Sequence, residues 1–162
     1  MHTSKKAASK PEIKPLERKH VGALYSMTIL PEQENFVAPN GVTMGEALFE
    51  PGSEVFSIWQ DETAVGLLAI IDFSHPDAIL HPGEDPSSLY VWRLLIDEDH
   101  QRRGYGTFAL NFAKQMMHDK GLTAVFITSV DKPGSAIPLY EGQGFVRTGR
   151  IVDGETELVW RP

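Results

Sequence analysis

A short basic, glycine-containing segment, Gln101–Thr107, is the part of the chain best suited to hold a ligand. It follows a run of β-forming residues and opens a segment with helical apolar spacing. The first turn of a helix leaves backbone N–H groups without intrahelical partners, and its dipole favours an anion there. Gly104 and Gly106 have no side chains to keep a phosphate from those groups, and Arg102 and Arg103 add positive charge. The segment predicts a phosphate or pyrophosphate seat, although a glycine pair alone also fits a plain strand-to-helix turn.

The elements around this seat form a predicted strand–helix–strand unit. Leu89–Ile96 is rich in β-forming residues and predicts the preceding strand. Apolar residues at helical spacing predict a helix over Thr107–Lys120, which Gly121 is suited to end. The β-branched run Thr123–Val130 predicts the next strand. We therefore expect a parallel crossover.

The residues near the N-terminus predict a short strand and two helices. Ile13–Leu16 reads as an edge strand, and Glu17–Thr28 has helical apolar spacing. Thr43 and Glu46 have the spacing of a capping box for a second helix. The loop between the helices, Pro31–Pro39, carries apolar residues that either cover a substrate or tuck into the core.

Hairpins are predicted on both sides of the crossover. Val55–Trp59 and Val65–Phe73 read as one antiparallel pair, and Gly66 within it indicates a bulge or a close approach of backbone. Phe145–Thr148 and Glu155–Trp160 read as a second pair, joined by an Asp-Gly turn. A short helix, Ala136–Gln143, with Ser135 as its N-cap, is expected before the second hairpin.

Composition excludes several classes of protein. The chain has 162 residues, enough for one domain with a real core, and 41% of them are hydrophobic. A net charge of −7 argues against nucleic-acid binding. The absence of cysteine excludes disulfides and thiolate nucleophiles, and the six histidines lack the spacing of metal ligands, so no metal site is expected.

The chain is expected to be one domain without a membrane anchor. Residues 1–11 are polar and lysine-bearing, which predicts a flexible tail rather than a secretory signal, and residues 12–162 predict the domain. The longest apolar run, Ala64–Ile71, is too short to span a bilayer. A cytoplasmic location is the expectation.

A dinucleotide-binding motif competes for the glycine turn, because Gly104–Ala109 also satisfies G-x-G-x-x-A. In that motif the strand runs almost directly into the first glycine. Here the polar segment Asp97–Arg103 intervenes and an antiparallel hairpin precedes it, so we reject that reading. No Gly-Lys-Ser/Thr sequence follows Gly106, which excludes a P-loop motif.

Two motifs give the chain a family resemblance. Gln101–Gly106 fits Q/R-x-x-G-x-G/A, and Leu139–Glu141 followed by Gly144-Phe145 fits L-Y-E-x-x-G-F. From about Ile13 to Trp160 the chain resembles the GNAT superfamily of acyl-CoA N-acyltransferases. That resemblance implies an α/β (α+β) fold with a mixed, mostly antiparallel sheet of about six to seven strands and about four helices.

The resemblance also implies roles for matching positions. Acetyl-CoA would be the cosubstrate, with its pantetheine arm along the strand and its pyrophosphate on the amides of the turn. Tyr140 would protonate the departing thiolate. The positions implied to bind the donor are Leu94, Leu95, Ile96, Gln101, Arg102, Arg103, Gly104, Tyr105, Gly106 and Thr107.

The acceptor implied by the resemblance is a small-molecule primary amine. Trp92-Arg93 before Ile96-Asp97 is similar to bacterial diamine or spermine/spermidine N-acetyltransferases, which makes a polyamine such as spermidine the expected acceptor. Another small amine, such as an antibiotic, an amino acid or a peptide N-terminus, stays open. So does a non-catalytic acyl-CoA sensor, and a homodimer is allowed without being shown.

The proton acceptor for that amine is left open. Many family members carry a glutamate on the strand before the turn, but Tyr90–Ile96 has no carboxylate. Asp97, Asp72 and a chain of waters are the alternatives. The asparagine that often precedes the short helix is also absent, and Ser135 is the residue that could take its place.

Overall fold

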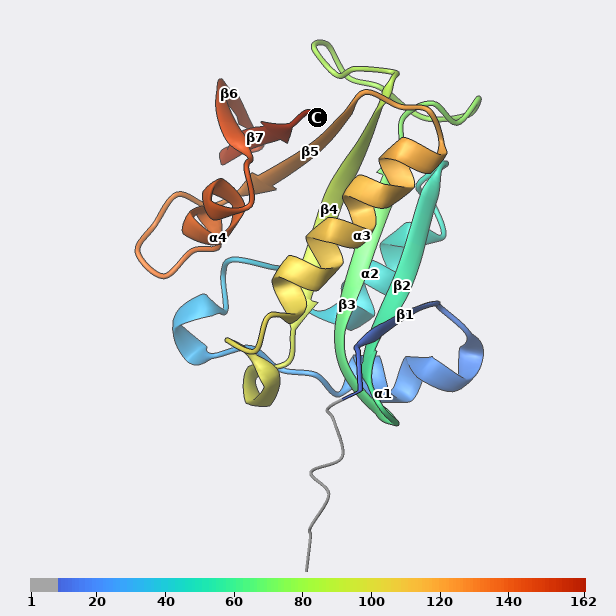
Figure 1. Cartoon of the computed structure of the whole chain (residues 1–162), viewed down its shortest axis with the longest axis vertical. Coiled ribbons are helices and arrows are strands. Elements are labelled where there is room, and N and C mark those ends of the chain that lie inside the picture. Colours follow the sequence, from blue (N-terminus) through green and yellow to red (C-terminus); the bar gives the residue numbers. More distant parts are fainter. Residues whose placement is uncertain (1–8) are drawn as a thin grey trace, which may run out of the picture.

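The computed structural model describes residues 9–162, which form one seven-stranded sheet in the order β1-β2-β3-β4-β5-β7-β6 (Figure 1). The strands are β1 (Glu12–Pro15), β2 (Ser53–Gln60), β3 (Thr63–Asp72), β4 (Ser88–Ile96), β5 (Ala124–Ser129), β6 (Val146–Val152) and β7 (Glu155–Trp160). The α-helices are α1 (Val21–Tyr25), α2 (Asn40–Ala47), α3 (Tyr105–Asp119) and α4 (Ile137–Gly142). Short 3-10 turns cover Arg18–His20, Pro31–Gln33 and Glu98–His100. The predicted mixed, mostly antiparallel sheet is confirmed; the tail predicted for residues 1–11 lies largely outside the described residues.

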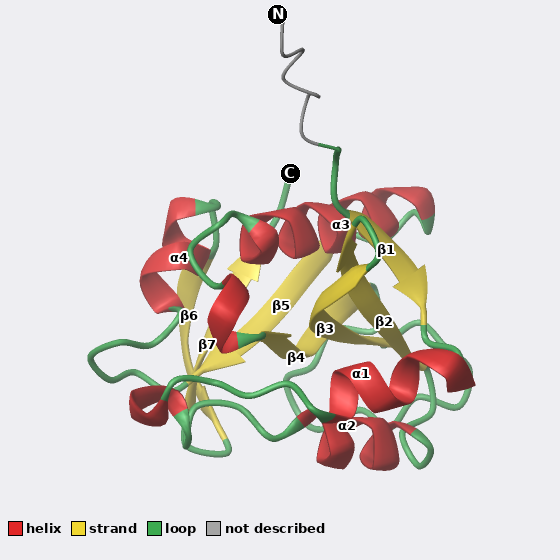
Figure 2. Ribbon diagram, turned by 90° about the horizontal axis from the view of Figure 1, so that it is seen from below, coloured by secondary structure: helices red, strands yellow, loops and turns green. Residues whose placement is uncertain are grey.

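Helices cover both faces of the sheet (Figure 2). Helices α1 and α2 lie on one face, and α3 and α4 lie on the other. The central strand β3 is buried on both sides: Leu68 and Ile70 belong to the core under α3, while Leu67 and Ala69 pack towards α1. This alternation follows from the two-residue period of a strand. None of the helices in the described part of the chain is long and apolar enough to cross a membrane.

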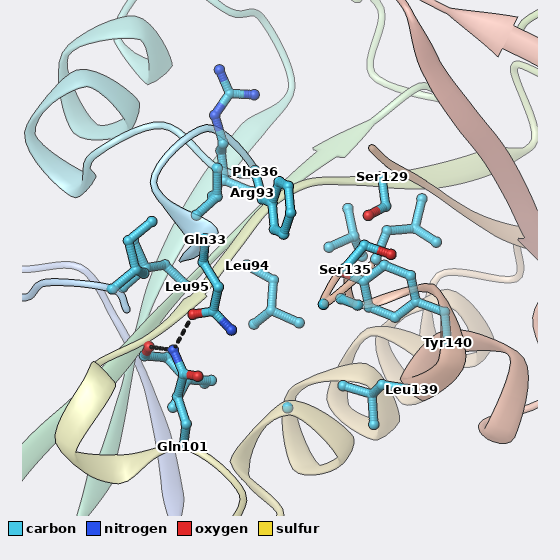
Figure 3. A pocket seen from close by; sticks show the side chains of 18 of the residues that line it. Gln33, Phe36, Arg93, Leu94, Leu95, Gln101, Ser129, Ser135, Leu139 and Tyr140 are labelled. Atoms are coloured by element: carbon cyan, nitrogen blue, oxygen red, sulfur yellow. Dashed lines mark hydrogen bonds between the residues drawn. The ribbon is translucent and has the colours of Figure 1, made fainter. Parts of the chain in front are cut away.

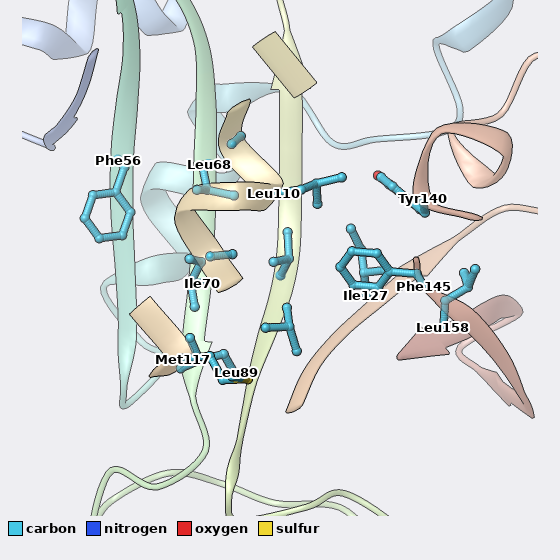
Figure 4. Packing of buried hydrophobic residues seen from close by; sticks show 14 of the residues in the cluster. Phe56, Leu68, Ile70, Leu89, Leu110, Met117, Ile127, Tyr140, Phe145 and Leu158 are labelled. Carbon is cyan, nitrogen blue, oxygen red and sulfur yellow. The ribbon is translucent and has the colours of Figure 1, made fainter. Parts of the chain in front are cut away.

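The larger core lies between the sheet and α3 (Figure 4). Helix α3 buries Ala109, Leu110, Ala113 and Met117 against it, and burying a side chain of the size of Leu or Met contributes about 1.5–3 kcal/mol. Gly121 follows the helix with φ +68°, as expected for a left-handed helix stop. This packing holds the N-terminus of α3 against the end of β4.

Strands β4 and β5 pair over only part of their length. The parallel ladder joins Ser88–Val91 to Ala124–Ile127 and stops there. Beyond Val91 the strands diverge (Figure 1), and β4 continues to Ile96 paired with β3 alone. Trp92 is the extra residue of a β-bulge, since Ala69 pairs with Arg93 and Ile70 with Val91. A bulge increases local twist, so β4 turns away from β5 at this point.

Several predicted element boundaries need correction. The first helix is short: a 3-10 turn leads into α1, which ends at Tyr25 rather than Thr28. The capping box predicted at Thr43 and Glu46 is wrong, because α2 already begins at Asn40 after Pro39 and no side chain caps it. Proline fixes its own φ near the helical value, so a start beside Pro39 is compatible with its geometry.

The short helix α4 also starts later than predicted. It begins at Ile137, with Ala136 rather than Ser135 at the N-cap position. Ser135 still contributes, because its Oγ accepts a hydrogen bond from the Ile137 N–H at 3.4 Å. Pro138 lies in the first turn, where no intrahelical N–H bond is lost.

Gly66 makes the close backbone approach that its position in a strand predicted. A Cβ at this position would lie 2.7 Å from the Leu95 carbonyl oxygen and 2.8 Å from Ile96 Cδ1. The absence of a side chain therefore lets β3 lie tightly against the half of β4 that has lost its other partner.

We expect Gly66→Ala to lower the free energy of unfolding by about 1–3 kcal/mol, because the methyl group must displace backbone. Gly45→Ala is the matched control: this exposed position in α2 has nothing within 4 Å of a built Cβ. The control should be neutral or stabilising by about 0.5–1 kcal/mol. Urea denaturation of both variants measures the difference. Equal stability of Gly66→Ala and the parent would show that the contact is not tight.

Candidate functional site

A cleft of about 760 Å³ opens where β4 and β5 part (Figure 3). Its walls are the unpaired half of β4, the end of β5, the first turn of α3, the start of α4 and the loop Pro31–Pro39. Elements that are distant in sequence thus contribute to one cavity. Its walls include apolar side chains such as Leu94, together with polar groups at both ends.

The main chain of Leu94 and Ile96 faces this opening. The Asp97 N–H donates to the Val65 carbonyl at 2.9 Å, so these two residues form a hydrogen-bonded pair of the antiparallel ladder. Such pairs alternate along antiparallel strands, so Leu95 also directs its backbone groups to β3. The backbone amides and carbonyls of Leu94 and Ile96, on either side of Leu95, therefore point away from β3 and towards the opening. The predicted row Leu94–Ile96 therefore offers two residues, not three, for pairing with a ligand.

The Gln101 side chain already contacts one of these backbone groups, the Ile96 carbonyl. The Gln101 Nε2 donates to the Ile96 carbonyl at 3.1 Å and to Gln33 Oε1 at 2.8 Å. This second bond ties the loop Pro31–Pro39 to the turn before α3. At the other end of the loop, the Phe36 ring lies 3.9 Å from a Cβ built at Gly134. The loop therefore borders the cleft from the turn to the β5–α4 connection, and the reading that its apolar residues line a binding site is the one supported.

The turn before α3 presents a series of backbone donors. From Arg102 to Thr107, no backbone N–H donates to an acceptor among residues 9–162, and the first helical bond runs from the Phe108 N–H to the Gly104 carbonyl at 3.0 Å. Arg102 and Gly104 have φ values of +61° and +88°, and left-handed residues of this kind turn successive N–H groups to one side. Strained non-glycine backbone of this type concentrates at functional sites. The geometry fits an anion.

Nearly all the residues predicted to bind the donor line this cleft. They are Leu94, Leu95, Ile96, Gln101, Arg102, Gly104, Tyr105, Gly106 and Thr107. Arg103 does not line it and is exposed. Tyr105 contributes main chain only, because its ring is buried in the core and its hydroxyl donates to Gln60 Oε1 at 3.2 Å. A helical residue in the first turn can point its side chain inward while its N–H stays at the open end of the helix.

Tyr140 lies on α4 and borders the same cleft. Its side chain is buried against Phe145, and its hydroxyl has no hydrogen-bond partner among the described residues. Burial raises the pKa of this phenol well above its ordinary value, and the charge of the nearby Glu155 carboxylate raises it further. The group is therefore held as a neutral phenol that can donate a proton into the cleft.

The carboxylates proposed from sequence as proton acceptors lie elsewhere. Asp97 accepts from the Thr28 N–H and contacts His100 Nδ1 at 3.1 Å, and Asp72 contacts Lys120 Nζ at 3.0 Å. Neither lines the cleft. Ser135 does line it, and its hydroxyl accepts a hydrogen bond from the Ile137 N–H without donating to any residue from 9 to 162.

Sequence reasoning missed some residues that the fold brings to the cleft. The sequence places Glu155 only at the start of a predicted strand, Thr128 within another and Gln33 within the loop Pro31–Pro39, and the structure brings all three to the cleft. Glu155 opens β7, and Thr128 lies near the end of β5. No local motif marks them. They meet because β7 pairs with β5.

Comparison with known proteins identifies the class. The model of the acetyltransferase (GNAT) family matches residues 13–145, most of the chain, so this protein belongs to that family of acyltransferase enzymes. N-acetyltransferase family 8 member 2 of Rattus norvegicus is 30% identical over 96 residues, which are 57% of this chain and 40% of that relative. The chain thus spans about two fifths of the length of this relative.

Solved structures share the fold at low sequence identity. The aminoglycoside acetyltransferase AAC(6')-Ib in complex with coenzyme A superposes with a TM-score of 0.73 at 14% identity, over 94% of this chain and 95% of that one. The spermidine/spermine N-acetyltransferase SpeG of Vibrio cholerae gives a TM-score of 0.62 at 16% identity, over 93% and 92%. The predicted family and its fold are confirmed, and coenzyme A in such structures agrees with the predicted acetyl-CoA.

A side chain at position 106 should interfere with donor binding. A Cβ on Gly106 would lie 3.0 Å from Leu139 Cδ2, across the space between α3 and α4. We expect Gly106→Val to weaken coenzyme A binding tenfold or more, because its methyl groups cover the amides of the turn. Isothermal titration calorimetry with coenzyme A measures this.

Gly142→Ala is the control for that experiment, since nothing lies within 4 Å of its built Cβ and it does not line the cleft. Its affinity should match the parent. Unchanged binding by a folded Gly106→Val variant would remove the turn from the donor site.

Proposed function

We propose that this protein is an N-acetyltransferase that moves the acetyl group of acetyl-CoA to a primary amine. The observation that carries the proposal is one cleft that combines an open strand edge, a row of unused amides and a buried phenol. Each of these suits a different part of the donor: the amide-containing arm, the pyrophosphate and the thioester.

The donor is expected to lie along β4 with its pyrophosphate at α3. The amide and carbonyl of Leu94 can pair with the pantetheine arm as an added strand would. The amides from Arg102 to Thr107 can hold the pyrophosphate, supported by the positive end of α3. Arg102 adds charge beside them. The thioester then falls near Tyr140, on the far side of the opening.

The transfer itself is direct attack of a neutral amine on the thioester carbonyl. An alkyl ammonium has a pKa near 10.4, so producing the free amine at neutral pH costs roughly 4–5 kcal/mol. The amine nitrogen forms the C–N bond, the C–S bond breaks, and the thiolate takes a proton from Tyr140, which the proton lost by the nitrogen then replaces. Burial keeps that phenol protonated until the thiolate forms.

Diamines and polyamines are the acceptors that we propose to test first. The chain carries a net charge of −7, and the carboxylates of Glu34 and Glu155 line the cleft. The shared fold of the Vibrio cholerae spermidine/spermine enzyme adds support. A panel of polyamines, aminoglycosides, amino acids and peptide amines, with release of free coenzyme A as readout, tests the class. Turnover of another amine but of no polyamine would assign a different class of acceptor. Tight acetyl-CoA binding without turnover of any amine would favour a non-catalytic acyl-CoA sensor.

We expect Tyr140→Phe to lower kcat by about 10²-fold or more while acetyl-CoA affinity stays within about twofold, since a general acid contributes on this scale. Phenylalanine keeps the packing on Phe145 and removes only the hydroxyl. Tyr25→Phe, at an exposed position outside the cleft lining, is the matched control. Equal losses in kcat and in affinity would contradict the assigned role.

The raised pKa of Tyr140 sets a pH dependence. A phenol whose pKa lies above the ordinary value of about 10 keeps its proton up to at least that pH. The active form of Tyr140 is therefore present throughout neutral and moderately alkaline solution. We expect kcat to rise with pH as the amine loses its proton, and to show no falling limb below about pH 10. A Tyr140-dependent fall centred at pH 8–9 would contradict the buried, neutral phenol.

A further inference from the structure

The Glu155 side chain lines the cleft, and one of its two carboxylate oxygens accepts no hydrogen bond from residues 9–162. It is half-buried at the start of β7, and it lines the same cavity as Tyr140. Its Oε2 accepts a hydrogen bond from Thr128 Oγ1 at 2.6 Å. Its Oε1 has no hydrogen bond, and the carboxylate forms no ion pair with any residue from 9 to 162. A carboxylate in this state can take a hydrogen bond from a cationic ligand.

A chain of hydroxyl groups holds Glu155 in place. Thr128 gives its single proton to the carboxylate, so it can only accept in its 2.8 Å contact with the Tyr90 hydroxyl. Tyr90 on β4 therefore donates to Thr128 on β5, which donates to Glu155 on β7. Glu155 Oε2 is the acceptor at the end of this chain. Burial raises the pKa of Tyr90 and the charge of Glu155 adds to it, whereas the bond to Thr128 acts against it, so Tyr90 stays a neutral donor.

Other acidic residues near the cleft lack this combination. Glu34 lines the cleft but is exposed on the loop Pro31–Pro39. Glu157 lies two residues along β7 from Glu155, and it is buried and fully occupied by Thr148 at 2.8 Å and Arg150 at 3.3 Å. Among residues 9–162, the buried Glu157 thus pairs with a cation, whereas Glu155 at the cleft does not.

We propose that Glu155 receives the ammonium group of the acceptor and takes its proton, a role that rests on the proposed transferase function. One proton passes from the ammonium nitrogen to Oε1 and on to solvent, which frees the lone pair. The nitrogen then attacks the thioester carbon. The second proton leaves the nitrogen of the tetrahedral intermediate and replaces the one that Tyr140 gives to the thiolate. Each turnover thus yields an amide, a thiol and one released proton.

The groups facing Glu155 suit this role. Tyr140 approaches from α4, Tyr90 from β4 and Thr128 from β5, and all three are neutral at pH 7. On its own hairpin, the charges of Glu157 and Arg150 are paired with each other. The carboxylate therefore stands among neutral donors beside the proposed acid, with its charge available to the substrate.

The test compares Glu155→Gln with the parent on two acceptors at several pH values. Glutamine keeps the shape and can still accept from Thr128, but it cannot take a proton. We expect kcat for an ordinary alkyl amine to fall about 10²-fold or more at pH 7, and the deficit to narrow as pH approaches the amine pKa near 10.4. With a fluorinated amine that is already neutral at pH 7, the two proteins should differ less than threefold.

Glu62→Gln, an exposed position outside the cleft lining, is the control for the change in net charge. It should match the parent on both acceptors, and coenzyme A affinity should be the same in all three proteins. A Glu155→Gln variant that loses activity equally on both acceptors, or only through KM, would overturn the proton-acceptor role. An active parent with an equally active variant would also overturn it while leaving the transferase function intact. A parent inactive on every amine would remove both proposals.

Discussion

The separation of β4 from β5 after four paired residues is the constraint on which the site depends. Each strand is held along its length on its other side, β4 by β3 and β5 by β7, so the sheet behaves as two halves joined by a short ladder. The bulge at Trp92 turns β4 away at the end of that ladder. Gly66 then allows β3 to support the unpaired part of β4 closely. An unpaired strand edge is normally a liability, and here it is enclosed in a cleft where a ligand can satisfy it.

Charge is distributed unevenly around this opening. The turn before α3 supplies positive potential from backbone dipoles and Arg102, while the opposite end has Glu155 and the Tyr140 phenol, whose pKa is raised. An anionic donor and a cationic acceptor would therefore be attracted to opposite ends of one cavity. Tyr140 lies at the acidic end, where burial and then the charge of Glu155 raise its pKa and keep the phenol protonated.

The sequence predicted much of the fold and the donor side of the site, because local patterns carry that information. The glycine turn, the strand before it and the helix after it are adjacent in the chain, and they line the cleft as expected apart from Arg103. The start of α2 was misplaced because Pro39 and Asn40 outweighed a capping pattern at Thr43. Glu155 could not be assigned from sequence, since its contact with Thr128 exists only through the pairing of β5 with β7.

The bond from Gln101 to the Ile96 carbonyl bears on how tightly a thioester donor can be held. That carbonyl faces the opening and is already satisfied, so an arriving amide there exchanges one hydrogen bond for another. An exchange of this kind yields little net free energy, because the group was never desolvated without a partner. Discrimination between donors must then come mainly from Leu94 and from the turn. The bond from Gln101 to Gln33 uses the other hydrogen of the same amide nitrogen, so the neighbouring loop can stay tied to the turn while the Ile96 carbonyl changes partner.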